Sequence, residues 1–430
     1  MPSILILGAG RSSSALISYL LKFGAASGID VTVGDVSLQA AKERTSGKAI
    51  EFDVNNKEQS KEAIRDASLV VSLIPAHLHT EVAKICLQTG SHLLTASYVS
   101  DEMKKLDQES RSKSLLFLNE CGLDPGIDHM SAMQVMDRIR SEGGKINSFE
   151  SFTGGLIAPE TDTDNPWRYK FTWNARNVVM AGQSTAKFLD KGEYRYIPYQ
   201  RLFKTITPVI VPGYGEYEGY ANRDSLKYLE TYGLHDVSTM LRGTLRNKGF
   251  CSAWNVLVQL GCCEDTYEME NVSSMTHASF MRSFGQITDA STEDMKRLQW
   301  SGLFSDEKVG LSKGTPAQIL EHILNKKWKL KPDDKDLVVM WHRFKFEVQG
   351  SKLNGNSKVM EASLVAKGSN SVDTAMAKTV GLPLGIAAKL LIQGKIKQRG
   401  VVIPTAREIY DPVLEELKSL GIELTEKIIQ

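Results

Sequence analysis

The stretch Ser3-Ile4-Leu5-Ile6-Leu7-Gly8-Ala9-Gly10-Arg11-Ser12-Ser13 decides the fold of this chain. Its apolar first half predicts a buried strand, and the apolar positions 16, 17, 20 and 21 that follow predict a helix. Gly8 and Gly10 allow a sharp turn and let the backbone approach a pyrophosphate, whose charge would rest on the amides at the start of that helix. Ser13 replaces the third glycine of the usual fingerprint. The stretch predicts a dinucleotide-binding turn, and the alternative is a tight turn without a ligand.

Apolar strands and amphipathic helices alternate up to about residue 120. The predicted strands are residues 4–7, 31–33, 49–52, 69–73, 92–95 and 115–118. Such alternation with short connections is typical of βαβ units and of a parallel sheet that is covered on both faces. The first part of the chain is therefore predicted to be a Rossmann-type domain.

Composition sets the limits of the other interpretations. The 430 residues carry a net charge of +1, so no overall field favours nucleic acid or an anionic membrane. The five cysteines include no CxxC pair, which favours a reducing compartment, and we expect a cytoplasmic protein. The start of the chain does not resemble a cleaved targeting sequence, and we expect no membrane span because the apolar runs are shorter than the roughly 20 residues that a span requires.

Asp35 stands at the end of the second predicted strand, 25 positions after Gly10. An acidic residue near this spacing accepts hydrogen bonds from the adenosine ribose and would repel the 2′-phosphate of NADP. Val36 follows it, not a basic residue. We therefore expect NAD to be preferred, with NADP possible. The alternative is that Asp35 caps the helix that begins near Ser37.

The ends of the fourth and fifth predicted strands supply further candidates, because open α/β sheets bind ligands at the carboxyl ends of their strands. The predicted cofactor-binding residues are Gly8, Gly10, Arg11, Ser12, Ser13, Asp35, Ser72, Leu73, Ile74, Pro75 and Thr95. His77 and His79 could suggest a metal pair, but no nearby Cys or carboxylate completes a site, and we expect no metal.

The second half of the chain has a different pattern. Residues 343–348 and 358–365 are extended runs on either side of the turn Asn354-Gly355, which predicts a hairpin of an antiparallel sheet. Between about residues 225 and 330 the apolar periodicity is helical.

Several longer motifs occur in order along the chain. They are LDPGIDH (123–129), GG..APE (154–160), DNP..YKF.W (164–173), NRDS (222–225) and RGTLR (242–246), together with SLIP (72–75) and TASY (95–98). On these residues the sequence resembles the saccharopine reductases, the glutamate-forming saccharopine dehydrogenases, from residue 3 to the C-terminus.

The resemblance implies an NAD(P)-dependent oxidoreductase of lysine metabolism. Saccharopine, water and oxidised cofactor would give glutamate, 2-aminoadipate semialdehyde and reduced cofactor. It also implies a homodimer with a Rossmann domain, a mixed α/β domain with an antiparallel sheet, and a helical insertion. The expected boundaries are residues 1–122, with 390–430 returning to the Rossmann domain; 123–225 and 331–389 for the substrate-binding and dimerisation domain; and 226–330 for the insertion.

Saccharopine has three carboxylates and one secondary amine, so its site needs cations, preferably arginine forks. The substrate-binding residues that the resemblance implies are Ser97, Tyr98, Asp124, Arg223, Arg242, Gly243, Thr244 and Arg246. The candidates for proton transfer are Asp124, Tyr98, His129 and Lys170. The sequence does not choose among these four. Asp124 ranks first for substrate contact, and His129 has packing as its alternative role.

There are three alternatives to this function. A polyamine-forming dehydrogenase on the same scaffold would need acidic substrate motifs, which the arginines disfavour. A non-catalytic NAD(P)-binding protein would bind cofactor without turnover. A hydrolase is disfavoured because the chain has neither GxSxG nor a P-loop.

Overall fold

The computed structural model describes residues 2–181, 183–348 and 357–429. The chain forms two compact units, Met1–Ser141 with Val372–Leu424 and Glu142–Ser371 with Thr425–Gln430. Each unit is built around its own sheet.

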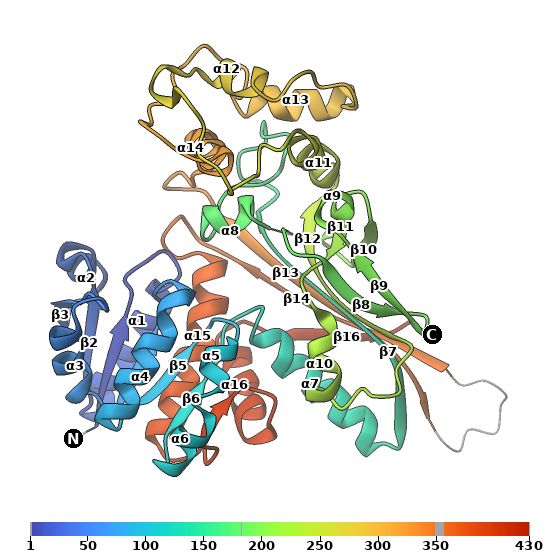
Figure 1. Cartoon of the computed structure of the whole chain (residues 1–430). Coiled ribbons are helices and arrows are strands. Elements are labelled where there is room, and N and C mark those ends of the chain that lie inside the picture. Colours follow the sequence, from blue (N-terminus) through green and yellow to red (C-terminus); the bar gives the residue numbers. More distant parts are fainter. Residues whose placement is uncertain (1, 182, 349–356, 430) are drawn as a thin grey trace. The chain divides into compact units, whose positions relative to one another are not determined.

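The first unit contains a seven-stranded sheet in the order β15-β6-β5-β4-β1-β2-β3, whose pairings are all parallel (Figure 1). The strands are β1 (Ser3–Leu7), β2 (Asp30–Asp35), β3 (Lys48–Glu51), β4 (Leu69–Ser72), β5 (His92–Thr95), β6 (Leu116–Leu118) and β15 (Gly400–Val402). The predicted strands agree with the first six of these, and the seventh comes from the end of the chain. The strand order reverses direction between β1 and β4, which is where doubly wound sheets bind their ligands.

Helices connect and cover these strands. They are α1 (Ser14–Ser27), α2 (Leu38–Arg44), α3 (Lys57–Arg65), η1 (Ala76–Leu78), α4 (His79–Thr89), α5 (Asp101–Lys104), α6 (Asp107–Ser112), α7 (Ile127–Ser141), α15 (Ala375–Ile392) and α16 (Arg407–Ser419). The strands β1 and β4 are almost entirely buried, as expected for a parallel sheet covered on both faces.

The second unit contains a nine-stranded mixed sheet. Its main path is β10-β11-β12-β7-β13-β14-β16, and β8 joins β12 to β9. The strands are β7 (Gly144–Ile157), β8 (Ala186–Asp190), β9 (Glu193–Ile197), β10 (Ile206–Val211), β11 (Gly215–Ala221), β12 (Thr239–Asn247), β13 (Asp336–Val348), β14 (Ser357–Lys367) and β16 (Leu424–Ile428). β12 and β7 are parallel, whereas β7, β13 and β14 are antiparallel neighbours. The predicted hairpin is thus confirmed as β13 and β14; its turn lies outside the described residues.

The remaining elements of this unit are mostly helical. They are α8 (Ala175–Val179), α9 (Tyr199–Leu202), η2 (Ser225–Lys227), α10 (Tyr228–Thr231), α11 (Phe250–Leu260), η3 (Val272–Ser274), α12 (His277–Arg282), α13 (Thr292–Trp300) and α14 (Pro316–Trp328). Their core contains an aromatic cluster in which Trp167, Phe250, Trp254 and Trp328 contact one another. The helical character predicted for residues 226–330 is seen, interrupted at β12.

The division into units differs from the expected boundaries at two helices. α7 belongs to the first unit because it packs against α16, and all of α15 belongs there because it packs against α1. A Cβ at Gly381 would lie 2.8 Å from the backbone nitrogen of Leu16, so small residues allow α1 and α15 to approach closely. The compact units therefore place α7 and all of α15 with the first sheet, whereas the expected boundaries at 122 and 390 assign α7 and most of α15 to the second domain. The helical stretch 226–330 lies within the second unit.

The described residues include one helix, α15, that is long and apolar enough to cross a membrane, with a mean hydropathy of 1.5 over 18 residues. The sequence interpretation missed it. Because 72% of that window is buried inside the protein, the helix also meets the description of a core helix.

Candidate functional site

The glycine-rich turn after β1 is constrained at its first glycine and open at its second. Gly8 has φ +102°, and a Cβ there would lie 3.1 Å from the carbonyl carbon of Leu73. A Cβ on Gly10 would meet nothing within 4 Å. The protein's own packing therefore requires Gly8, whereas Gly10 keeps space open at the start of α1. That space suits the close approach of a pyrophosphate.

The hydroxyl residues of this turn differ in role. Ser13 is buried, and its Oγ donates a 2.8 Å hydrogen bond to the carbonyl oxygen of Gly10, which fixes the turn that a third glycine would otherwise serve. Arg11 is exposed, and Ser12 is half-buried. Arg11 is thus a cation presented on the surface of the turn.

Asp35 is held by the main chain on both carboxylate oxygens. Its Oδ2 accepts a 2.8 Å hydrogen bond from the amide of Ala9, and its Oδ1 accepts one of 3.0 Å from the amide of Ser37. The N-cap of α2 is Ser37, whose Oγ accepts from the amide of Ala40. Asp35 therefore braces the glycine-rich turn against the start of α2.

The ends of β4 and β5 meet at a buried histidine. Ser72 and Thr95 are paired in register, and His79, the first residue of α4, lies beside both. Its Nδ1 is 3.0 Å from Ser72 Oγ, and its Nε2 is 3.0 Å from Thr95 Oγ1 and 2.9 Å from Ser97 Oγ. Burial, with a smaller effect of His77, lowers the pKa of His79 to about 4, so the imidazole is neutral at physiological pH.

This arrangement does not support the alternative of a metal pair. His77 is exposed, whereas His79 is directed to three hydroxyl groups. In the part of the chain that the structure describes, no group of three His, Cys, Asp or Glu side chains could hold a metal ion.

Tyr98 and Asp124 form a pair in the same unit. The Tyr98 hydroxyl donates a 3.0 Å hydrogen bond to Asp124 Oδ1. Asp124 precedes a cis peptide bond to Pro125, and both side chains of the pair are half-buried. The structure thus brings together Asp124, which the sequence analysis ranked first for contact with substrate, and Tyr98, another of its candidates.

His129 lies fully buried in α7. Its Nε2 is 2.8 Å from Glu120 Oε2, and the other carboxylate oxygen of Glu120 accepts a hydrogen bond from the amide of Val99. Glu120 itself has φ +54°. These contacts connect the ends of β5 and β6 to α7 and agree with the packing alternative for His129; a catalytic role stays an untested prediction.

In the second unit, β11 and β12 bring the two arginine motifs together. The amide of Asn222 donates to the carbonyl oxygen of Arg242, and the amide of Arg242 donates to Ser225 Oγ at 2.9 Å each. Arg223 is exposed with φ +56°, and the Arg242 guanidinium is buried 4.3 Å above the centre of the Tyr228 ring. NRDS and RGTLR are therefore one local structure.

The other residues of RGTLR have contrasting surroundings. A Cβ on Gly243 would lie 2.3 Å from the Phe152 ring, so this position requires glycine. Thr244 is half-buried, while Arg246 is 3% exposed and packs over the rings of Tyr169, Tyr220 and Phe250. This packing gives Arg246 a role in the core, and its contact with substrate stays a prediction.

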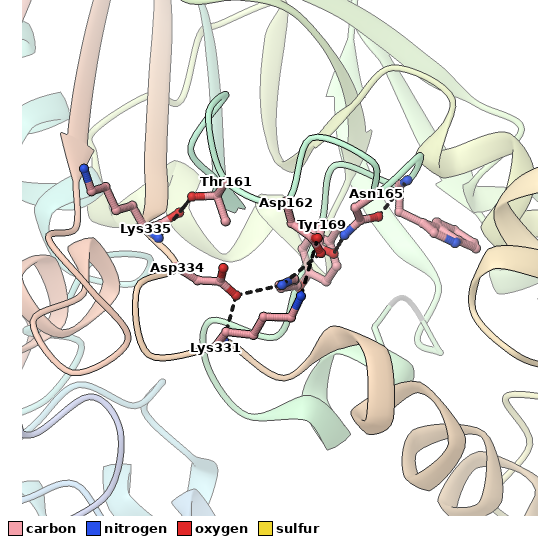
Figure 2. Close-up of polar contacts among 9 residues, drawn as sticks. Thr161, Asp162, Asn165, Tyr169, Lys331, Asp334 and Lys335 are labelled. Carbon is pink, nitrogen blue, oxygen red and sulfur yellow. Dashed lines mark hydrogen bonds and ion pairs between the residues drawn. The ribbon is translucent and has the colours of Figure 1, made fainter.

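Lys170, the remaining candidate for proton transfer, is fully buried between two carboxylates. Its Nζ lies 2.9 Å from Asp162 Oδ2 and 2.7 Å from Asp334 Oδ2. Figure 2 shows these carboxylates with Lys331, whose amide donates to Asp334. Both contacts engage the ammonium group, so the role that the structure gives to Lys170 is to join two carboxylates of the second unit.

Two features of the site were not found from the sequence. The His79 cluster was not predicted, because the spacing of His77 and His79 was interpreted only as a possible metal pair. Glu120 was missed because nothing in the sequence links it to His129. The occurrence of Ser72, Thr95 and Ser97 at two strand ends was the available signal for the first.

The geometry defines a class of protein. A parallel sheet with a glycine-rich turn at its reversal point and a polar rim at β4 and β5 is typical of dinucleotide-dependent oxidoreductases. Comparison with known proteins gives the family. The model of the saccharopine dehydrogenase NADP binding domain matches residues 4–118, and that of the saccharopine dehydrogenase C-terminal domain matches residues 122–422.

Full-length relatives agree with these matches. The chain is 35% identical to saccharopine dehydrogenase [NADP(+), L-glutamate-forming] of Pyricularia oryzae and 33% identical to the protein of that name from Saccharomyces cerevisiae, over 99% of each chain. The solved structure of apo saccharopine dehydrogenase (L-Glu forming) from Saccharomyces cerevisiae has a TM-score of 0.88 at 32% identity, with both chains fully covered. The chain belongs to the saccharopine dehydrogenase family, an oxidoreductase family. The resemblance stated from the motifs is confirmed.

The expected preference for NAD is wrong. Three of the matching relatives are named as NADP(+) enzymes, and the matching N-terminal family model is an NADP binding domain. The physical reason lies in Asp35, because both of its oxygens are bound by backbone amides of the protein itself. The sequence spacing identified an acidic residue at the correct strand end but not the direction of its side chain.

Proposed function

We propose that this protein is an NADP-dependent saccharopine dehydrogenase that forms L-glutamate in lysine metabolism. It would convert saccharopine, water and NADP+ into glutamate, 2-aminoadipate semialdehyde and NADPH. The observation that carries the proposal is the full-length similarity to proteins of that name, combined with a TM-score of 0.88 to one of their structures.

The residues of the first unit fit the cofactor. Gly8 and Gly10 would hold its pyrophosphate at the start of α1, where free amides favour an anion. Arg11 is the exposed cation of that turn and is our candidate for the 2′-phosphate, since Asp35 is directed to the main chain. When bound, the dinucleotide accepts a hydride from the substrate carbon next to the amine.

Asp124 and Tyr98 suit the reacting amine. A carboxylate attracts the secondary ammonium of saccharopine, and the hydrogen bond from Tyr98 holds the carboxylate in one orientation. Loss of a proton must precede oxidation of the amine, and we assign its acceptance to Asp124 because Lys170 is enclosed by carboxylates and His129 is bound to Glu120. Substrate carboxylates would be bound by Arg223 and Arg242.

The test is reduction of NADP and of NAD by the purified protein, each followed at 340 nm with saccharopine and with glutamate identified as product. We expect NADP to be used at least about tenfold more efficiently, a preference that requires only ~1.4 kcal/mol. Failure of saccharopine to reduce either cofactor would overturn the proposal.

Two further proposals concern assembly and location. The family resemblance leads us to propose a homodimer, which light scattering tests. The cysteine pattern leads us to propose a cytoplasmic location, which imaging of a tagged protein tests.

A further inference from the structure

His79 has a position that neither the glycine-rich turn nor the Tyr98–Asp124 pair explains. It is a buried side chain of α4 that contacts the ends of two neighbouring parallel strands through three hydroxyl groups. All three of its partners are hydroxyl groups, each of which has a hydrogen of its own to donate.

The number of hydrogens at this cluster decides what it can do. A neutral imidazole carries one N–H and one acceptor nitrogen, so it accepts one hydrogen bond. Ser72, Thr95 and Ser97 together carry three hydroxyl hydrogens, of which two must therefore point away from the ring. Among the described residues, no acceptor other than the ring is within hydrogen-bond distance of these two hydrogens. The remaining contact of the cluster is the amide of Ser97, which donates to Thr95 Oγ1 at 3.3 Å and so accepts no hydrogen.

Hydroxyl donors in such a place favour a ligand with an acceptor oxygen. Ser72 and Thr95 are almost fully buried, and an unpaired buried donor is unfavourable. In a sheet of this type the adenosine half of a dinucleotide lies toward β2, and the nicotinamide half therefore lies toward β4 and β5. The carboxamide oxygen is the acceptor that this half offers.

We propose that His79 is a positioning residue, which orients the hydroxyls of Ser72, Thr95 and Ser97 so that the rim donates a hydrogen bond to the nicotinamide carboxamide oxygen of NADP. It acts through these hydroxyls and does not itself touch the reacting atoms. This inference rests on the proposed function only in taking NADP as the cofactor.

The experiment measures binding, so it requires no turnover. Dissociation constants are determined by calorimetry for NADP and for its thionicotinamide analogue, whose sulfur is a weak acceptor. We expect the wild-type protein to bind NADP about three- to tenfold more tightly than the analogue, as one hydrogen bond allows. In His79→Leu that ratio should fall to nearly 1. In His79→Gln the ratio should lie between these two values, because the side-chain amide of Gln can both donate a hydrogen bond to the hydroxyls and accept one from them.

Two controls separate positioning from general damage. The affinity for 2′,5′-ADP, which lacks the nicotinamide half, should change less than twofold in His79→Leu. His277 is also buried, lies in the helical part of the second unit and contacts the carbonyl oxygen of Gly302 at 2.9 Å. His277→Leu therefore matches the substitution and its burial, and should leave the ratio unchanged.

An unchanged ratio in His79→Leu, an equal loss of 2′,5′-ADP affinity, or a wild-type protein that binds both dinucleotides alike would overturn the inference. Failure of the proposed function has a different signature, because the ratio would persist while saccharopine failed to reduce NADP.

Discussion

Two buried basic side chains join distant segments in this protein, and their chemistry differs. Lys170 is a charged ammonium enclosed by Asp162 and Asp334 in the second unit. His79 is a neutral imidazole surrounded by three hydroxyls in the first. In the first cluster the carboxylates neutralise the buried ammonium. In the second, two hydroxyl hydrogens have no acceptor within the cluster and can donate to another molecule. In this protein the ion pairs of Lys170 hold segments of the second unit together, whereas the hydroxyls around His79 are the groups that we propose bind the cofactor.

The largest expected effect tests the charged cluster. Lys170→Met should lower the free energy of unfolding by about 3–5 kcal/mol, because it leaves two largely buried carboxylates without their cation. Urea denaturation followed by circular dichroism measures it. Lys331→Met is the matched control: Lys331 is exposed and 3.9 Å from Asp162, so its loss should cost less than about 1 kcal/mol. Equal effects of the two substitutions would show that the cluster does not stabilise the fold.

The next prediction asks whether the second unit also binds a ligand. Arg223→Gln should raise KM for saccharopine about ten- to 150-fold, corresponding to the roughly 1.5–3 kcal/mol of a charged hydrogen bond, and should leave NADP affinity nearly unchanged. Initial-rate kinetics and calorimetry measure the two quantities. Gln retains a long side chain at a position with φ +56°, so the backbone is perturbed little. A parallel loss of NADP affinity would contradict a role toward substrate.

The third prediction uses pH to test the neutral cluster. The pKa of His79 is lowered to about 4 by burial, whereas in the unfolded chain it is near 6.5. As the pH falls below 6.5 the unfolded chain binds a proton that the native state does not, so stability is lost until the pH reaches about 4. Between pH 7 and pH 5 this amounts to about 2 kcal/mol.

Parallel urea titrations of the wild-type protein and of His79→Leu at both pH values isolate this contribution. The variant has no imidazole at this position, so the stability that it loses between pH 7 and pH 5 should be smaller by about 2 kcal/mol than the loss of the wild-type protein. Identical pH dependence in the two proteins would mean that the native state protonates His79 with the same pKa as the unfolded chain, which is contrary to a cluster that holds the imidazole neutral.

The smallest effect concerns Asp35. Asp35→Asn keeps one acceptor oxygen for the turn and should weaken NADP and NAD by similar factors, changing their ratio of kcat/KM less than about threefold. Its oxygens bind backbone amides, so the side chain does not select between the ribose forms. A shift of tenfold or more toward NADP would show that the carboxylate does face the 2′-phosphate.

Local sequence patterns predicted much of the fold because each reflects local physics. Alternation of short apolar runs with amphipathic segments identified the parallel sheet, and glycines at 8 and 10 located its turn. The long motifs identified the family. The seventh strand, β15, could not be predicted in this way, since residues 400–402 become a strand only by pairing with β6.

For the functional candidates, too, local sequence predicted one property and the tertiary structure decided another. The sequence by itself determined which residue types stand at the strand ends, such as Asp35, Ser72 and Thr95, because strand ends follow from apolar runs. Only the tertiary structure decided what their side chains face. Asp35 turned to two amides, Lys170 to two carboxylates and His79 to three hydroxyls. Partners such as Lys170 and Asp334 are 164 positions apart, and a contact over that separation depends on the packing of the whole unit.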